Sequence, residues 1–214
     1  MIRPRKMETT AVGVLMGIFL AAAFAVLSPL PARASGVTEV VRDTVERVLA
    51  VVEDPALQGP DKKEERRARA MEIIHERFDF EAFSRRALGV YWKDRTGEER
   101  AEFVRVFTRC LMDVYMDAIE SRRIERVVYT GEFLRGGRAE VRTLVLTALA
   151  EDMRMDYRLM DYGKGRGWMI YDVVVDGVSL VVNYRTQFKE IIERSSYEEL
   201  VEVLREKSGE LEIR

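Results

Sequence analysis

Apolar residues recur at the spacing of an α-helix through the first half of the chain. From residue 37 they follow the i, i+3, i+4, i+7 pattern of one helical face, and this pattern stops near Pro55. Asp61 with Glu64, and Thr96 with Glu99, have the spacing of a capping box, which bonds free backbone N–H groups at a helix start. The pattern predicts four helices, at residues 37–54, 61–76, 79–89 and 96–121.

After Arg123 the period of the apolar positions changes from 3.6 to 2, which indicates β-strands. Gly136 and Gly137 mark a tight turn, and the glycine-rich segment 163–167 marks another. The expected strands span residues 124–134, 138–149, 153–162 and 168–176, and two further helices span 178–194 and 197–207. The expected fold class is therefore α+β, with a four-stranded antiparallel meander sheet wrapped by six to seven helices.

A run of 17 uncharged residues begins at Ala11 and follows three basic residues. The small residues Ala32 and Ala34 then occupy the two positions that signal peptidase reads. We therefore expect residues 1–34 to be a signal peptide cleaved before the next residue, and residues 35–214 to form one exported domain. The alternative is an uncleaved membrane anchor, because 17 apolar residues is the lower limit for spanning a bilayer.

Composition narrows the classes of function. The 214 residues are 47% hydrophobic and 34% charged, and the net charge of −2 provides no basic field for binding nucleic acid. Cys110 is the only cysteine, so an internal disulfide is impossible and the exported domain must be stabilised by its apolar core. We expect a monomer that binds no nucleic acid.

The sequence lacks recognisable catalytic and metal-binding signatures. His75 is the only histidine, and we expect it on the surface of a charged helix, without partners at a metal-ligand spacing. There is no G-x-S-x-G nucleophile motif. The glycines of 163–167 lead into a strand rather than a helix, so they indicate a hairpin turn and not a phosphate loop. The basic run at 66–70 is expected on a solvated helix face, paired with nearby glutamates.

Asp172 is the carboxylate whose position raises a question. It alternates in phase with Trp168, Ile170 and Val174 in an expected strand, which places it among apolar side chains. A buried carboxylate needs a partner or a change of protonation. It could bind Arg185 or cap nearby backbone, or it could be the base of an enzyme that pairs an Asp with a Tyr donor in an apolar pocket.

Three longer segments carry motifs of a known family. They are FDFEAFSRRALGVYW at 78–92, FVRVFTRCLMDVY at 103–115 and GWMIYDVVVDGVSLVVNYRTQF at 167–188. They resemble the MlaC family, exported phospholipid carriers also known as toluene-tolerance auxiliary proteins of an ABC transport system. The motif positions that carry over are Leu88, Gly89, Tyr91, Trp92, Trp168, Tyr171, Asp172, Gly177, Ser179, Asn183, Tyr184, Arg185 and Phe188.

The resemblance implies an α+β domain that encloses an apolar pocket for acyl chains while the headgroup stays near solvent. It implies a periplasmic carrier that moves glycerophospholipid between an outer-membrane lipoprotein complex and an inner-membrane ABC transporter complex, binding each transiently. Such transport maintains the lipid asymmetry of the outer membrane. The resemblance also implies no catalytic residues, no metal and no cofactor besides the phospholipid carried.

A carrier of this kind needs a dry pocket, because each methylene moved into water costs about 0.8 kcal/mol. The helix expected at 96–121 is apolar over more than half its circumference, and unbranched methionines suit chains of different length. We expect the long helix and the strands to line the pocket with Phe103, Phe107, Leu111, Tyr115, Val141, Val145, Tyr157, Leu159, Trp168, Ile170 and Val174.

Other interpretations of function stay open at this point. The pocket could hold a different apolar ligand, such as a sterol-like molecule or a quinone. The protein could instead be an enzyme that acts on an apolar substrate through Asp172 and a tyrosine. A third possibility is an interaction module with a filled core, which composition alone favours because ordinary domains are closely packed.

Overall fold

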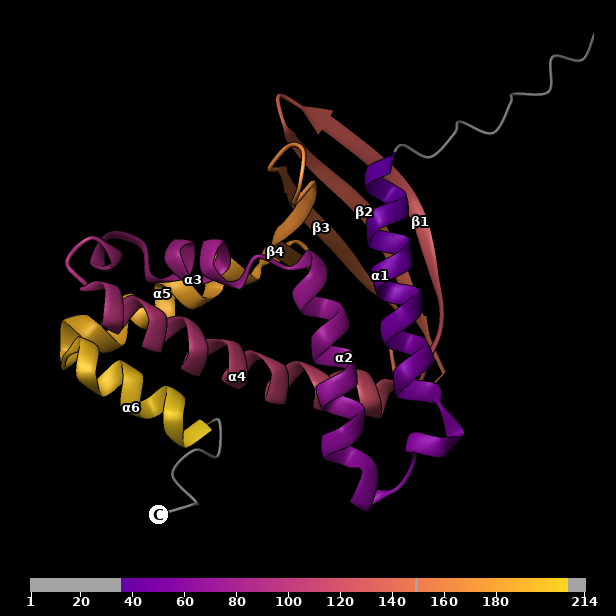
Figure 1. Cartoon of the computed structure of the whole chain (residues 1–214), viewed down its shortest axis with the longest axis horizontal. Coiled ribbons are helices and arrows are strands. Elements are labelled where there is room, and N and C mark those ends of the chain that lie inside the picture. The colour runs from indigo at the N-terminus through magenta and orange to yellow at the C-terminus, as the bar shows by residue number, and fades with distance from the viewer. Residues whose placement is uncertain (1–35, 149, 208–214) are drawn as a thin grey trace, which may run out of the picture. The chain divides into compact units, whose positions relative to one another are not determined.

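An antiparallel sheet organises the computed structural model, which describes residues 36–148 and 150–207 (Figure 1). Its strands follow one another in the order of the sequence. They are β1 (Ile124–Arg135), β2 (Arg138–Thr147), β3 (Met153–Asp161), β4 (Trp168–Val175) and β5 (Val178–Ser179). The predicted meander is confirmed, with β5 as a fifth, two-residue strand on the end of β4. The expected signal peptide at 1–34 lies outside the described residues.

Six α-helices accompany the sheet in the described part of the chain. They are α1 (Gly36–Glu53), α2 (Lys63–Arg77), α3 (Phe80–Leu88), α4 (Gly97–Arg122), α5 (Leu180–Arg194) and α6 (Tyr197–Lys207). Short 3₁₀ turns at Pro55–Leu57, Pro60–Lys62 and Gly89–Trp92 connect them. Within residues 36–148 and 150–207, no helix is long and apolar enough to cross a membrane.

The two predicted capping boxes have different outcomes. At α4, the Glu99 backbone N–H donates to Thr96 Oγ1 at 3.2 Å and the Thr96 backbone N–H donates to Glu99 Oε2 at 2.6 Å, as expected. At α2 the expected box of Asp61 and Glu64 is wrong. The helix begins two residues later, because a 3₁₀ turn occupies this position and Lys62 forms the N-cap without a side-chain bond.

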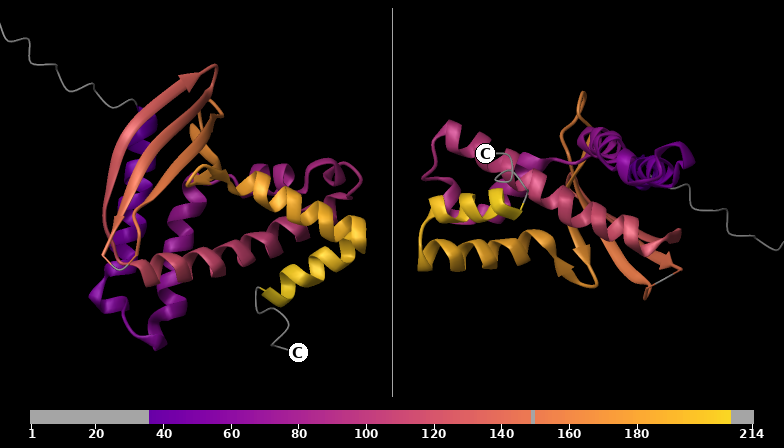
Figure 2. Two further views of the ribbon diagram at one scale, coloured as in Figure 1. Left: turned by 180° about the vertical axis from the view of Figure 1, so that it is seen from behind. Right: turned by 90° about the horizontal axis from the view of Figure 1, so that it is seen from below.

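The helix α1 lies along one face of the sheet, over β1 and β2, while α3, α5 and α6 pack around α4 at the other end (Figure 2). The N-terminus of α1 is anchored by a carboxylate on β1. Both the backbone N–H and the hydroxyl of Thr38 donate to Glu132 Oε2, at 3.1 and 2.5 Å. A carboxylate at this position also complements the positive end of the helix dipole.

Ion pairs join α2 to α4, and they correct one expectation. Arg66 is buried, and its guanidinium donates to Glu120 Oε1 at 2.9 Å and to the Leu57 carbonyl at 2.6 Å. Arg67 binds the other oxygen of the same carboxylate at 3.1 Å and also pairs with Asp117. The basic run at 66–70 is therefore only partly the solvated face that its composition predicts.

The edge strand β1 is irregular. Its register against β2 shifts between Ile124 and Arg126 and again between Tyr129 and Gly131, so Glu125 and Thr130 are extra residues on the edge. Extra residues of this kind interrupt the ladder of hydrogen bonds and increase the local twist.

Buried apolar side chains fall into three clusters rather than one core. The helical cluster joins α3, α4, α5 and α6 and is rich in aromatic rings. The sheet cluster joins α1 to the sheet through Val37, Val41, Ala139, Val141, Tyr157, Leu159 and Ile170. A small cluster of Val48, Ala70 and Met116 joins α1, α2 and α4.

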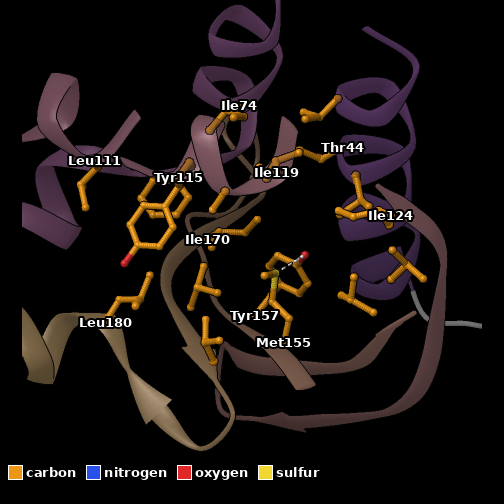
Figure 3. Close-up of a pocket in the computed structure, with 18 of the residues that line it drawn as sticks. Thr44, Ile74, Leu111, Tyr115, Ile119, Ile124, Met155, Tyr157, Ile170 and Leu180 are labelled. Carbon is orange, nitrogen blue, oxygen red and sulfur yellow. Dashed lines mark hydrogen bonds between the residues drawn. The ribbon is translucent and has the colours of Figure 1, made fainter. Parts of the chain in front are cut away.

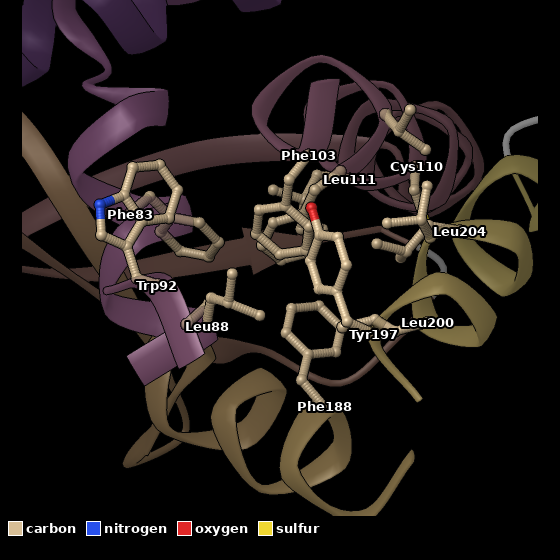
Figure 4. Packing of buried hydrophobic residues seen from close by; sticks show 14 of the residues in the cluster. Phe83, Leu88, Trp92, Phe103, Cys110, Leu111, Phe188, Tyr197, Leu200 and Leu204 are labelled. Atoms are coloured by element: carbon tan, nitrogen blue, oxygen red, sulfur yellow. The ribbon is translucent and has the colours of Figure 1, made fainter. Parts of the chain in front are cut away.

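Aromatic rings from four helices meet in the helical cluster (Figure 4), and Phe107 contacts several of them. Its ring centroid lies 5.6 Å from that of Phe83, 5.6 Å from Phe103 and 4.8 Å from Phe188, so one ring contacts α3, α5 and the preceding turn of α4. Tilted and edge-on aromatic pairs at such distances stabilise the fold beyond the contribution of the apolar area that they bury.

The substitution Phe107→Ala is expected to lower the free energy of unfolding by about 3–5 kcal/mol, because it leaves a cavity among rings that cannot collapse onto it. Urea denaturation followed by circular dichroism measures this loss. A change below about 1 kcal/mol would contradict the close packing of the cluster.

Candidate binding cavity

An apolar cavity of ≈ 290 Å³ lies where the three clusters meet (Figure 3). Ligand sites in proteins start at about this size. Helices α1 to α5 and strands β1 to β4 all contribute to its wall, which consists of Thr44, Val45, Val48, Leu49, Ile74, Phe78, Phe80, Phe83, Leu111, Met112, Tyr115, Ala118, Ile119, Arg122, Ile124, Val127, Val145, Met153, Met155, Tyr157, Ile170, Val173, Val175 and Leu180.

Local backbone geometry explains how the strands supply this wall. On β3, Met153, Met155 and Tyr157 alternate toward the cavity. On β4 the register against β3 shifts after Ile170, so that Tyr171 is an extra residue. The shift brings Val173 and Val175 to the cavity side, because it reverses the alternation along the rest of the strand.

Two of the polar side chains in the wall, Thr44 and Tyr157, have hydrogen-bond partners within the protein. Thr44 Oγ1 donates to the Val40 carbonyl at 2.8 Å within α1, and the Tyr157 hydroxyl lies 3.1 Å from Met155 Sδ (Figure 3). Burial raises the pKa of Tyr157 and of Tyr115, so both phenols stay neutral at physiological pH. The wall can hold apolar chains, and it presents no nucleophile or general base.

Five of the residues predicted to line the pocket do line this cavity: Leu111, Tyr115, Val145, Tyr157 and Ile170. The other six do not belong to its wall. Phe103 and Phe107 lie in the helical cluster, and Val141 and Leu159 lie beneath α1 in the sheet cluster, with Trp168 packed against it. Val174 is buried on the opposite side of β4, because the extra residue Tyr171 reverses the phase after Ile170.

Sequence reasoning missed the contribution of α1. Its apolar face was recognised as a helix face, and four of its residues, from Thr44 to Leu49, line the cavity. The methionines of β3 alternate with charged residues, so their side of the strand could also have been identified. The position of the β4 irregularity has no comparable signal in the sequence.

The family-motif positions lie outside the cavity wall. Several of them fix the junction between α3 and α5. Arg185 Nε donates to the Arg86 carbonyl at 2.8 Å, and Gly89, with a φ of +64°, lies against the Arg185 side chain. Ser179 caps α5 by accepting a hydrogen bond from the Val182 N–H at 3.2 Å. The helical cluster includes further motif positions, either as buried members or packed against it: Leu88, Tyr91, Trp92, Tyr184 and Phe188. Gly177 lies in the β4–β5 turn with a φ of +84°, and Asn183 lies in α5.

Asp172 is buried, and both oxygens of its carboxylate accept hydrogen bonds. Its carboxylate accepts hydrogen bonds from Arg158 at 3.1 Å, from the Ser179 hydroxyl at 2.7 Å and from the Val181 N–H at 3.1 Å. Of the two structural alternatives for Asp172, the backbone cap is confirmed, and the arginine that it binds is Arg158 rather than Arg185. Asp172 therefore connects β4 to the start of α5, away from the cavity wall, where an anion is favoured by the helix dipole.

These features define a class: an α+β protein that encloses an apolar binding cavity. Comparison with known proteins then gives the family, because the sequence profile of the MlaC protein family matches residues 42–206. The chain belongs to the MlaC family. A solved structure of a phospholipid-binding protein from Ralstonia solanacearum, in complex with a phospholipid, matches with a TM-score of 0.71 and 27% sequence identity. The match covers 81% of this chain and 97% of that one. No curated protein matches.

The family and this neighbour indicate a binding or transport protein. Among the described residues, no group of histidine, cysteine and acidic side chains is arranged to hold a metal ion. His75 is exposed and its ring contacts Phe80 in a tilted arrangement, with ring centroids 4.8 Å apart.

The variant Asp172→Asn is expected to lower the free energy of unfolding by about 1–3 kcal/mol, because an amide cannot accept all three hydrogen bonds of the carboxylate. The amount of ligand bound per folded protein should not change. Denaturation and solvent extraction measure the two quantities. Unchanged stability with lost binding would instead place Asp172 in the binding machinery.

Stability is expected to fall above pH ~10, the ordinary pKa of tyrosine. Burial raises the pKa of Tyr115, Tyr157 and Tyr184 in the folded protein, so unfolding releases protons above this pH and alkali favours the unfolded state. The stabilisation is complete below pH ~10 and is lost as the pH rises through the folded pKa values. Chemical denaturation between pH 8 and about 11 should show that the free energy of unfolding falls less steeply with pH in Tyr157→Phe than in the unsubstituted protein. Equal slopes would contradict the burial of this phenol.

Proposed function

We propose that the protein is a periplasmic phospholipid carrier. It takes glycerophospholipid from one membrane complex and delivers it to another, between an outer-membrane lipoprotein complex and an inner-membrane ABC transporter, and so maintains outer-membrane lipid asymmetry. Family membership and the phospholipid bound to the Ralstonia solanacearum neighbour support this proposal. Residues 1–34 direct export and are then removed.

The observation that carries the proposal is the apolar cavity. Its wall is aliphatic and aromatic apart from two satisfied hydroxyl groups, a second tyrosine and one arginine. Moving a methylene into water costs about 0.8 kcal/mol, so two acyl chains with roughly 30 methylenes cost on the order of 20 kcal/mol to expose. A dry wall that removes this cost is the physical requirement for carrying lipid through an aqueous compartment.

The wall is also built to adapt. Met112, Met153 and Met155 are unbranched and polarisable, so they fill gaps of different shape. The buried residues of the surrounding clusters form separate groups, with Phe78 packed against both the helical and the sheet cluster, so the cavity lies between packed units rather than inside one of them. Both properties favour lipids of varied chain length over one rigid ligand such as a sterol.

Native mass spectrometry of residues 35–214, purified from a periplasmic fraction without detergent, tests the cargo. The expected result is a mass increment that extracts as diacyl phospholipid. A quinone or sterol-like extract would replace the cargo in this proposal. A protein without bound ligand, unchanged after incubation with phospholipid vesicles, would overturn it. Fractionation of the full chain and N-terminal sequencing test export and cleavage before Ser35.

The substitution Ile119→Trp is expected to reduce bound phospholipid severalfold, because Ile119 faces the cavity from α4 and an indole would occupy the space of a chain. Val114→Trp is the matched control, since Val114 lies on the same helix and is 48% exposed. Lipid phosphorus per mole of protein measures the effect, with thermal unfolding as the test of folding. Equal occupancy in both variants would exclude this wall from chain binding.

A further inference from the structure

We infer that Arg122 binds the phosphate group of the lipid at the end of the cavity and so determines which end of the cargo faces water. This inference rests on the proposed function and adds to it a residue that recognises the headgroup. Among the described residues that line the cavity, Arg122 is the only charged one. It is half-buried, so its position marks a place where the apolar wall meets solvent.

Arg122 has no partner among residues 36–148 and 150–207: its side chain forms no hydrogen bond or ion pair with any of them. The carboxylate two residues before it, Glu120, is already shared by Arg66 and Arg67. A guanidinium that contributes to an apolar wall without a counter-ion is only partly solvated, and an anion at this place would complete its hydrogen bonds.

The position of Arg122 on α4 matches the two parts of an amphiphile. Wall residues follow one face of the helix from Leu111 through Tyr115 and Ile119 to Arg122. Eleven residues at 1.5 Å each give about 16 Å of wall, which is apolar apart from the Tyr115 hydroxyl until its charged end. An acyl chain along this face therefore brings the polar end of the lipid to the C-terminal end of α4, where β1 begins (Figure 1).

The chemistry of the side chain selects a phosphate. A planar guanidinium donates two parallel hydrogen bonds to a phosphate, keeps its charge at all relevant pH values and is weakly hydrated, so it suits a half-buried site. Every glycerophospholipid has this group, whatever its headgroup alcohol. Arg122 therefore distinguishes phospholipids from neutral diacylglycerols without selecting among phospholipids.

The test compares dioleoylphosphatidylglycerol with dioleoylglycerol, which has the same chains and no phosphate, in competition binding to the full chain, with inorganic phosphate as a third probe. Arg122→Gln should lose about tenfold or more of its affinity for the phospholipid and keep its affinity for the diacylglycerol. Arg122→Lys should retain part of the preference. Arg105→Gln, an exposed site on α4 outside this wall, should behave like the unsubstituted protein.

The outcomes separate the inference from the proposed function. If Arg122→Gln keeps the full preference for phospholipid, or loses both lipids equally, Arg122 is not the phosphate contact. A change in thermal unfolding with unchanged lipid preference would assign it only a structural role at the helix end. Binding of inorganic phosphate alone at Arg122, without binding of lipid, would make this a free-phosphate site and overturn the inference. If the unsubstituted protein binds neither lipid, the proposed function itself is wrong.

Discussion

The structure depends on one constraint: α4 has more apolar surface than its helical neighbours can cover. Its first half places Phe103 and Phe107 among α3, α5 and α6. Beyond Leu111 the apolar face continues for about three further turns toward the sheet. There it faces the strands across a cavity instead of packing against them. Covering this exposed apolar surface with another apolar group lowers the free energy. The property that folds the first half of the helix therefore gives the second half an affinity for acyl chains.

Sequence periodicity predicted the elements well, because each has one buried face and a regular backbone. Side-chain direction was harder to predict, since it depends on tertiary packing and on single extra residues. Val141 and Val145 share a face of β2, yet α1 covers one while the other lines the cavity. Val174 was assigned to the cavity by simple alternation, which the extra residue Tyr171 reverses. Five of the eleven residues expected in the wall thus line this cavity, and the positions of the other six have identifiable physical causes.

The residues that make the family recognisable and the residues that line the cavity are different sets. Asp172, Ser179 and Arg185 have specific hydrogen bonds that join α5 to β4 and α3, so few substitutes satisfy the same geometry. The wall requires only apolar volume, which many residue types supply. A resemblance in sequence therefore identifies the scaffold readily, while the binding surface has to be located by structure.

The irregular edge strand has a consequence for how the protein behaves among copies of itself. A straight, exposed sheet edge is a template on which another chain can pair and aggregate. In β1, Glu125 and Thr130 break the register at two places, and Glu125, Arg126, Glu132 and Arg135 place charges near both ends of the strand. The two interruptions divide the row of free backbone groups into shorter runs and increase its twist, which disfavours extension by a second molecule. Part of the resistance to edge pairing is therefore built into the strand itself.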